Sequence, residues 1–357
     1  MIRRPPRSTL DRSAAAADVY KRQGPFMARF NKAQVSLPGG CAWGPRPVDF
    51  HIKALEKMGA KIELTGGYIN SSGKLKGADI VFDKSSVGAT GNVIMAAVKA
   101  DGCTRIVNAA MEPEIDCLID FLNILGSDIK RENDGSVIIN GVKDLKNKVV
   151  FDVIPDRIEA GTFMIATAMC GGDVTIKNVE PNHLTIVTNK LIESGAEINV
   201  NESHLRIKMD NRPNSIDMST AIYPGFPTDL QAQWMALMTI AKGSCTVTDT
   251  IYTDRFTHIA ELERLGAKIH LDNNVAHISG VEKLFGAQVM STDIRASASL
   301  VIAGLAAESE TEISRIYHID RGYVNIESKF LKLGLSLIHI SEPTRRRGIS
   351  YAVFCLK

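Results

Sequence analysis

The sequence lacks any long hydrophobic run. Its most apolar stretch, LVIAGLAA (300–307), is far shorter than the about 18 residues that a membrane-spanning helix needs. It also lacks a strong charge of one sign, because the formal net charge is only +2. The two ends carry net charges of +4 (residues 1–23) and +3 (residues 337–357), so the body between residues 24 and 336 has a net charge of −5 and is mildly acidic. We therefore expect neither a membrane nor a nucleic acid as a partner.

Paired cysteines are absent as well. The six cysteines, at positions 41, 103, 117, 170, 245 and 355, are scattered without the spacing of a metal site or a disulfide framework. This pattern is typical of free thiols in a reducing compartment. The N-terminal end has no apolar core of a secretion signal. The sequence thus predicts a cytoplasmic protein without a bound metal.

Both ends of the chain differ in character from the body. Residues 1–23 and 336–357 resemble translated sequencing-adapter reads, as in IRRPPRSTL and SLIHISEPTRR. We set both segments aside as artefacts and expect residues 1–23 to be disordered.

One phrase recurs along the body. It reads as the end of an amphipathic helix, a glycine and the start of a strand, as in ALEKMGAKIE (54–63) and ELERLGAKIH (261–270). A glycine in this place can close a helix in the left-handed conformation. The five glycines, at 59, 126, 195, 266 and 334, are 67 to 71 residues apart. This period is too long for the common solenoids and indicates a duplicated α/β subdomain.

Between these phrases lie helices that are apolar nearly all round. Examples are GATGNVIMAAVKADG and RASASLVIAGLAAES. Such helices belong beneath sheets and not at the surface. Each repeat therefore contains one buried helix, one amphipathic helix and several strands.

Cys41 lies in an unusual loop, LPGGCAWGPRPVDFH (37–51). Glycines before it and prolines after it expose a thiol on a stiff segment. Arg46 would favour the thiolate, which can act as an acid–base group or as a nucleophile. The alternative is a buried core cysteine.

Two other patterns allow more than one interpretation. Asp229, in FPTDLQAQW, precedes a buried helix, so helix capping is the simpler interpretation of its carboxylate. KSSVGAT (84–90) leads into another buried helix, whose backbone N–H groups can hold a diphosphate. Planar guanidinium groups bind carboxylate and phosphate through two hydrogen bonds. Arg46, Arg255, Arg295 and Arg321 are candidates for that task, with a solvated surface charge as the alternative for each.

Seven stretches resemble, in the same order, the UDP-N-acetylglucosamine 1-carboxyvinyltransferase family of enolpyruvyl transferases. They span residues 24–335 and are ARFNKAQVSLPGGCAWGPRPVDFH, LKGADIVFDKSSVGAT, PDRIEAGTF, YPGFPTDLQAQ, DRFTHIAEL, TDIRASASLVIAG and YHIDRGY. The resemblance implies an α/β (α+β) fold, a two-domain inside-out barrel of six βαβαββ-type repeats. One repeat is largely missing here. We expect a catalytic-loop domain at 24–154 with two subdomains, and a second domain at 155–335 with three.

The resemblance also implies a reaction. Enolpyruvate passes from phosphoenolpyruvate to the 3′-hydroxyl of UDP-N-acetylglucosamine by addition and elimination, an early step of peptidoglycan synthesis. It implies a monomer and no metal or organic cofactor. Cys41 would do acid–base work and carry an adduct, Asp229 would deprotonate the hydroxyl, and Arg321 would serve catalysis on the phosphate side.

The remaining site residues follow the family's pattern. Arg46 would join Arg321 near the phosphate, and Arg255 and Arg295 would lie on the carboxylate side. Ile251 would contact the sugar through its backbone. The uracil would lie against Arg46, Pro47, Val48, Asp49 and Phe50, and the phosphates against Lys84, Ser85, Ser86, Val87 and Gly88. His51 and Asp293 also match, and we interpret His51 as structural support.

The chain departs from the family at its N-terminal end, where the family carries further residues that bind phosphoenolpyruvate and the nucleotide. We therefore expect little turnover from the chain as written. Two alternatives remain. One is an enzyme like 5-enolpyruvylshikimate 3-phosphate synthase, which lacks this cysteine loop. The other is a non-catalytic paralogue that binds a UDP-sugar.

Overall fold

The repeat predicted from the glycine period is present in the structure. The computed structural model describes residues 19–37, 48–335, 337–340 and 351–354. The five glycines at 59, 126, 195, 266 and 334 all have positive φ angles, between 86° and 107°. Each ends an amphipathic helix and directs the chain into the next strand. The period in the sequence is therefore a period of helix-ending turns.

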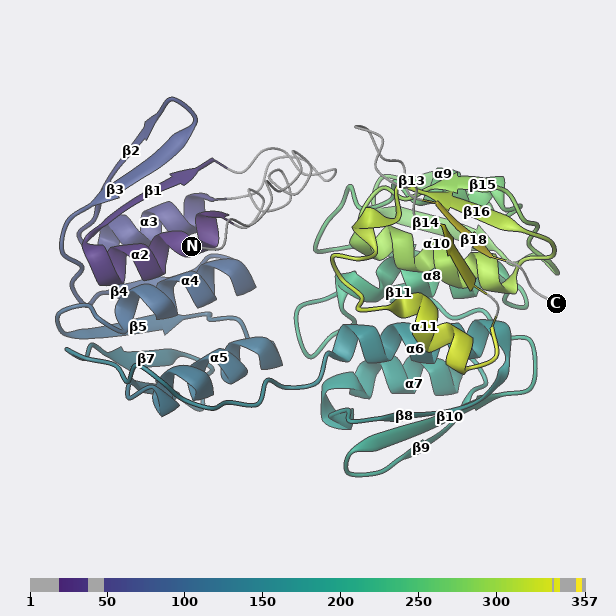
Figure 1. Cartoon of the computed structure of the whole chain (residues 1–357), viewed down its shortest axis with the longest axis horizontal. Coiled ribbons are helices and arrows are strands. Elements are labelled where there is room, and N and C mark those ends of the chain that lie inside the picture. Colours follow the sequence, from purple (N-terminus) through teal and green to yellow (C-terminus); the bar gives the residue numbers. More distant parts are fainter. Residues whose placement is uncertain (1–18, 38–47, 336, 341–350, 355–357) are drawn as a thin grey trace, which may run out of the picture. The chain divides into compact units, whose positions relative to one another are not determined.

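The chain divides into two compact units, Met1–Ile154 and Pro155–Lys357. Each has its own hydrophobic core, and the two cores share no residue. The first unit holds two sheets and the second holds three, drawn in purple to blue and in teal to yellow in Figure 1.

The first unit begins with a short 3₁₀ helix, η1 (Val19–Arg22), that continues into α2 (Gln23–Phe30). Its first sheet has the order β1-β3-β2 and carries α3 on one face. Its second sheet has the order β4-β5-β7-β6. The strands of the first sheet are β1 (Lys32–Ser36), β2 (Lys61–Thr65) and β3 (Tyr68–Ser72), with α3 spanning Asp49–Lys57. The second sheet contains β4 (Asp79–Val81), β5 (Cys103–Val107), β6 (Asp128–Arg131) and β7 (Val137–Asn140), with α4 (Val87–Ala97) and α5 (Pro113–Ile124).

The second unit begins with α6 (Arg157–Cys170) and holds three sheets of similar plan. The first sheet, β8-β10-β9, contains β8 (Gly172–Lys177), β9 (Glu197–Val200) and β10 (His204–Met209), with η2 (Pro181–Leu184) and α7 (Thr185–Glu193). The second sheet, β11-β12-β14-β13, contains β11 (Met218–Ser219), β12 (Ser244–Thr248), β13 (Lys268–Asp272) and β14 (Val275–Ser279), with η3 (Thr228–Leu230), α8 (Gln231–Thr239) and α9 (Ile259–Arg264).

The third sheet has the order β15-β16-β18-β17. It contains β15 (Gln288–Met290), β16 (Thr311–Ser314), β17 (Leu337–Ile340) and β18 (Tyr351–Phe354), with α10 (Ile294–Ala306), η4 (Ile316–His318) and α11 (Ile326–Lys332). The three four-stranded sheets share one topology, in which a parallel pair joined by a buried helix is extended by an antiparallel hairpin. The βαβαββ repeat and the α/β class are thereby confirmed.

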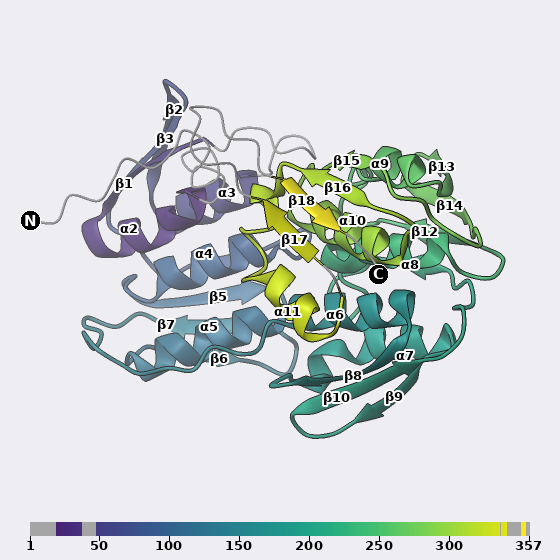
Figure 2. The same ribbon diagram turned by 45° about the vertical axis from the view of Figure 1, so that its right-hand side comes forward.

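The apolar helices lie inside the units and the sheets lie outside, as expected. In the second unit α6, α8 and α10 pack against one another, and Figure 2 shows them between the sheets. Every residue of α8 is buried. In the first unit α2 packs against α4 in the same way. Polar caps begin α6 and α10, because Asp156 accepts hydrogen bonds from the first turn of α6 and Asp293 from that of α10.

Residues 19–23 differ from the disorder that we expected for residues 1–23, and parts of the C-terminal segment that we set aside as an artefact form strands. Residues 19–22 form η1, and Gln23 is fully buried, with its Nε2 donating to Ser71 Oγ at 2.5 Å. Gly24 N donates to Asn92 Oδ1 at 2.8 Å, which fixes α2 on α4. Near the C-terminus, β18 pairs with β16 and β17 pairs with β18, which completes the last sheet. Backbone hydrogen bonds can recruit such a segment whatever its origin.

Candidate active site

Three of the residues predicted to act on the sugar and on phosphoenolpyruvate, Asp229, Arg255 and Arg295, meet in the second unit. Asp229 lies in η3, at the turn that leads into α8. Arg255 follows β12, and Arg295 lies in the first turn of α10. Although 26 and 66 residues separate these arginines from Asp229, both contact its carboxylate.

The Asp229 carboxylate lies between the two guanidinium groups. Arg255 Nη1 donates to Asp229 Oδ1 at 2.8 Å, and Arg295 Nη2 donates to Asp229 Oδ2 at 3.3 Å. The arginine side chains are only 10% and 17% exposed, whereas that of Asp229 is 40% exposed. The site thus presents an accessible carboxylate held by two buried cations.

Electrostatics keep this carboxylate ionised. Burial alone would raise the pKa of Asp229, but the charges and hydrogen bonds of Arg255 and Arg295 hold it below its ordinary value. For Arg295, burial would lower the pKa, but the Asp229 charge, together with Tyr323 and the Asp156 charge, raises it above its ordinary value. The cluster is therefore a stable arrangement of charges with a net positive excess that suits an anionic ligand.

The interpretation of Asp229 as a helix cap is wrong. Neither η3 nor α8 has a side-chain cap, and the Asp229 carboxylate accepts hydrogen bonds from Arg255 and Arg295 instead. An aspartate does cap a helix at a neighbouring position of the site, because Asp293 accepts hydrogen bonds from the first turn of α10. Burial raises the pKa of Asp293, and its Oδ2 has no hydrogen-bond partner among the described residues.

A buried aspartate, which sequence reasoning missed, supports the site from below. Asp249 is fully buried and accepts hydrogen bonds from the hydroxyls of Thr220 and Thr228 and from the N–H groups of Ile251 and Tyr252. Thr228 precedes Asp229, and Arg255 also donates to its hydroxyl at 3.2 Å. Asp249 therefore fixes both the turn of Asp229 and the backbone of Ile251. Its position in the strand-ending motif TVTDTIY was the available signal.

Arg321 lies beside this cluster on an exposed loop. Its neighbour Gly322 packs so closely on the start of α10 that an added Cβ would lie 2.2 Å from Ile294 Cγ2 and 3.7 Å from Arg295 Nη1. Burial, and then the charge of Arg321, lower the pKa of His318, while the Asp293 charge opposes this. Arg321 is thus near His318, and within the described part of the chain no hydrogen bond joins it to Asp229.

The nucleotide candidates gather at one end of the first unit. Val48 precedes α3, and Asp49 and Phe50 begin it, while Ser86 caps α4 by accepting from Ala89 N at 3.3 Å. The Phe50 ring packs edge-on against Phe82, which precedes the loop at Lys84 and Ser85. The starts of α3 and α4 therefore lie together.

His51 joins these two helix starts, as its interpretation as structural support requires. Asn92 Nδ2 lies 3.0 Å from its Nδ1, and its Nε2 is 3.6 Å from where a Cβ on Gly88 would lie. Burial, with the charge of Lys21, lowers the pKa of His51 to about 4, so the ring is neutral. Val87 is exposed, and Gly88 is half-buried beside the imidazole.

Three candidates, Cys41, Arg46 and Pro47, lie outside the described residues. Of the cysteines in the described part, burial raises the pKa of Cys170 to about 12 and that of Cys245 to about 11. Such thiols are poor nucleophiles at neutral pH.

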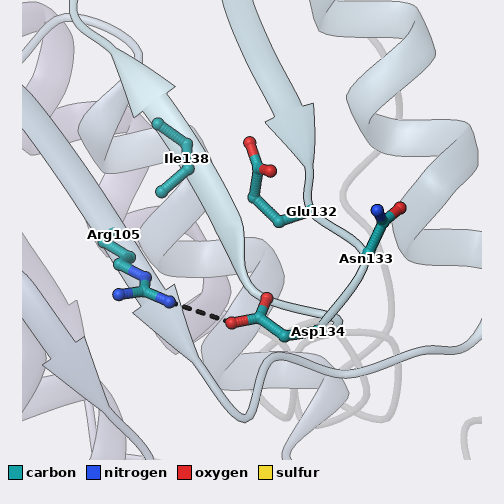
Figure 3. A pocket seen from close by; sticks show the side chains of 5 residues that line it. All are labelled: Arg105, Glu132, Asn133, Asp134 and Ile138. Atoms are coloured by element: carbon teal, nitrogen blue, oxygen red, sulfur yellow. Dashed lines mark hydrogen bonds and ion pairs between the residues drawn. The ribbon is translucent and has the colours of Figure 1, made fainter.

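A shallow surface pocket elsewhere in the first unit is lined by Arg105, Glu132, Asn133, Asp134 and Ile138 (Figure 3). It contains none of the predicted site residues.

The described residues contain neither a membrane-spanning helix nor a group of metal ligands. No helix among them is long and apolar enough to cross a bilayer. Within the same ranges, no three histidine, cysteine or acidic side chains gather as metal ligands would.

Comparison with known proteins identifies the fold and the family. A protein-family model described as EPSP synthase (3-phosphoshikimate 1-carboxyvinyltransferase) matches residues 22–330. Among solved structures, the enolpyruvyl transferase NikO from Streptomyces tendae superposes with a TM-score of 0.80 at 22% identity, covering 89% of this chain and 76% of that one. EPSP synthase from Acinetobacter baumannii gives 0.67 at 20% identity, with 95% and 78% covered. The fold is that of an enolpyruvyl transferase.

More similar sequences narrow the class. The UDP-N-acetylglucosamine 1-carboxyvinyltransferase of Desulfosudis oleivorans is 52% identical over 318 residues, which are 89% of this chain and 76% of that protein. The enzyme of the same name from Chlorobium luteolum is 50% identical over 317 residues, with 88% and 74% covered. The chain belongs to the EPSP synthase family of carboxyvinyltransferases and, within it, to the UDP-N-acetylglucosamine 1-carboxyvinyltransferases, as its sequence motifs predicted.

Proposed function

We propose that the protein transfers enolpyruvate from phosphoenolpyruvate to the 3′-hydroxyl of UDP-N-acetylglucosamine, with release of inorganic phosphate. The observation that carries this is the Asp229 carboxylate held between Arg255 and Arg295, on a fold shared with enolpyruvyl transferases. Relatives at half identity carry the name of this activity. We infer a cytoplasmic setting and a monomeric enzyme from the sequence, and both remain predictions.

The arginines and Asp229 divide the work. The carboxylate and phosphate of phosphoenolpyruvate compete with Asp229 for Arg255 and Arg295, since all are anions that a guanidinium binds. As the substrate takes over these hydrogen bonds, Asp229 loses the interactions that depress its pKa and becomes a better base. It can then accept the proton of the sugar hydroxyl.

The covalent steps balance without an added reactant. The 3′-oxygen forms a bond to C2 of phosphoenolpyruvate while its proton passes to Asp229, and the C3 methylene takes up a proton, for which Cys41 is the candidate donor. The tetrahedral intermediate then loses a proton from C3, the C2–O bond to phosphate breaks, and the enol double bond re-forms. Arg321 is the candidate for stabilising the departing phosphate.

The nucleotide would be held by the first unit. Lys84 and the backbone of residues 85–88 at the start of α4 can bind the diphosphate, because unpaired N–H groups and the helix dipole favour anions there. Residues 46–50 would contact the uracil, and Ile251 the sugar.

The test is phosphate release by the full chain from phosphoenolpyruvate, with UDP-N-acetylglucosamine or shikimate 3-phosphate as acceptor. We expect release only with the UDP-sugar. Because turnover can be low, intact-mass mapping after incubation with both substrates provides a second readout, in which we expect an adduct on Cys41 and none on Cys170 or Cys245. Release with shikimate 3-phosphate alone would select the alternative enzyme. UDP-sugar binding without release or adduct would select a binding protein.

Asp229→Asn tests the assigned base. We expect phosphate release to fall by about 10²- to 10³-fold, the usual range for a lost general base, while nucleotide binding measured by calorimetry persists. Asp173→Asn is the matched control, because Asp173 also pairs with an arginine, Arg206, but on an exposed sheet. A variant at Asp229 that retains full activity would contradict the assignment.

A further inference from the structure

A closed cluster of polar side chains lies beneath Arg295, where three apolar helices meet. It contains Thr162 of α6, Gln233 of α8 and Tyr323 of the loop before α11. Thr162 and Gln233 are fully buried, and Tyr323 is 2% exposed. Polar groups at such a depth are costly unless they are hydrogen-bonded, so their presence in a helix core calls for a role.

The hydrogen bonds of this cluster have one consistent direction. The Thr162 hydroxyl donates to Ile158 O at 2.8 Å, which uses its only hydrogen. Thr162 Oγ1, 3.0 Å from Tyr323 Oη, must therefore accept from the tyrosine. Gln233 Nε2 donates to both hydroxyl oxygens at 3.2 Å. Tyr323 Oη accepts one further hydrogen bond, from Arg295 Nη1 at 3.3 Å.

Arg295 is thus held from two sides. Its Nη2 contacts Asp229 in the site, while its Nη1 contacts Tyr323 in the core. Its guanidinium carbon also lies 5.6 Å from the centre of the Tyr323 ring. When a substrate anion draws Arg295 away from Asp229, the Tyr323 contact is the one that remains.

We infer that Tyr323 is a positioning residue for Arg295, backed by Gln233 and Thr162, which sets where this arginine meets the anionic substrate. The hydroxyl acts as an acceptor whose direction is fixed by α6 and α8, so Arg295 keeps one orientation before and after substrate binds. The inference deepens the proposed function. Only its effect on turnover rests on that function, because the orientation of Arg295 can be measured without turnover.

Tyr323→Phe is the direct test, since it keeps the ring and removes the hydroxyl. The readout is modification of individual arginines by phenylglyoxal, followed by peptide mapping. We expect Arg295 to react about tenfold faster in the variant, the equivalent of one lost charge-assisted hydrogen bond. Arg255 contacts the same carboxylate without Tyr323 and is the internal control, with an unchanged rate. An unchanged rate at Arg295, or an equal rise at both arginines, would overturn the inference.

A matched threonine pair guards against a general loss of packing. Thr162 and Thr167 both lie on α6, are buried, and donate to the carbonyl four residues earlier, but only Thr162 contacts Tyr323. Thr162→Val should raise the Arg295 rate about threefold, as for a weaker, neutral hydrogen bond, and Thr167→Val should not. Equal effects of the two substitutions would refute the assigned network.

Kinetics give a separate result. If the wild-type chain turns over, Tyr323→Phe should lower kcat/KM for phosphoenolpyruvate about tenfold and leave the KM for UDP-N-acetylglucosamine unchanged. Equal changes for both substrates would contradict a role through Arg295. If the wild-type chain shows no turnover, as the departure at its N-terminal end allows, the arginine mapping alone decides on Tyr323.

Discussion

At the scale of single residues, two buried histidines make stability depend on pH. Burial, with the charge of Arg255, lowers the pKa of His258 to about 3, and burial lowers that of His51 to about 4. Unfolding returns each imidazole to water, where its pKa is 6.5. Below pH 6.5 the unfolded chain therefore binds protons that the folded chain does not, and stability is lost as the pH falls from there toward the folded pKa.

The sign and size can be checked at His258, whose Nε2 lies 3.3 Å from Met235 Sδ. Between pH 6 and pH 4 we expect this residue to contribute a loss of about 1.4 kcal/mol per pH unit to the free energy of unfolding of its unit. His258→Leu should remove that contribution, as measured by urea titrations across this range. His277→Leu, on the exposed face of β14, is the control and should keep the wild-type slope. An equal slope in His258→Leu would show that this imidazole is not buried as a neutral ring.

Sequence reasoning at this scale succeeded for residue types and failed for partners. Asp229, Arg255 and Arg295 could be selected from their motifs, but no periodicity indicates that residues 26 and 66 positions apart share one carboxylate. Asp249 and Tyr323 escaped for a related reason. Their roles depend on which helices pack together, and a pattern along one segment shows its buried face without showing its neighbour.

At the scale of elements, the contact between α2 and α4 depends on the absence of a side chain at Gly24. A Cβ there would lie 2.2 Å from the backbone oxygen of Asn92, which cannot move without bending α4. Gly24→Ala should therefore destabilise the first unit by about 3 kcal/mol, at the upper end of ordinary overpacking. Thermal or urea unfolding measures this.

Gly91, on the other helix, provides the matched substitution. Its Cβ would lie 3.5 Å from Leu118 Cδ2, an ordinary contact. Gly91→Ala should therefore be neutral or stabilise by up to about 1 kcal/mol, because alanine favours helix more than glycine does. If both substitutions had the same effect, helix propensity and not the close approach would govern this contact.

Elements were the scale at which the sequence was most informative. The recurring glycines predicted the helix ends, and each has the positive φ that such an end requires. The all-round apolar helices predicted the inner layer. The ends of the chain were not predictable in this way. Their resemblance to adapter reads set residues 19–23, 337–340 and 351–354 aside, yet the first of these segments is helical and the other two form strands. For the strands the reason is that pairing with an exposed strand edge requires little of the side chains.

At the scale of the whole molecule, one segment joins the two units. Residues 141–156 contain no helix or strand, and Val150 and Val153 are 93% and 76% exposed. Exposed segments without secondary structure are preferred sites of proteolysis. Brief trypsin treatment should therefore cut after Lys146 or Lys148 before it cuts anywhere in 157–335.

The control replaces both lysines with glutamine and should delay that cut. Mass mapping of early fragments identifies the positions. First cuts within 157–335 in the wild-type chain would show that the second unit opens more readily than the connection, and would contradict the division into two separately packed units.

The confinement of strand pairing to single repeats has a consequence for partial unfolding of the molecule. Because every described strand pairs within its own repeat, losing or unfolding one repeat removes no strand-pairing partner from the next. What the neighbour loses is the apolar packing of its inner helix, together with side-chain hydrogen bonds between repeats such as those of Thr162, Gln233 and Tyr323. Damage to one repeat should therefore produce a species that keeps its remaining β-structure but exposes apolar helix surface. Such a species should self-associate and bind hydrophobic dyes. Cellular quality control would recognise it by this apolar surface and not by newly unpaired strand edges.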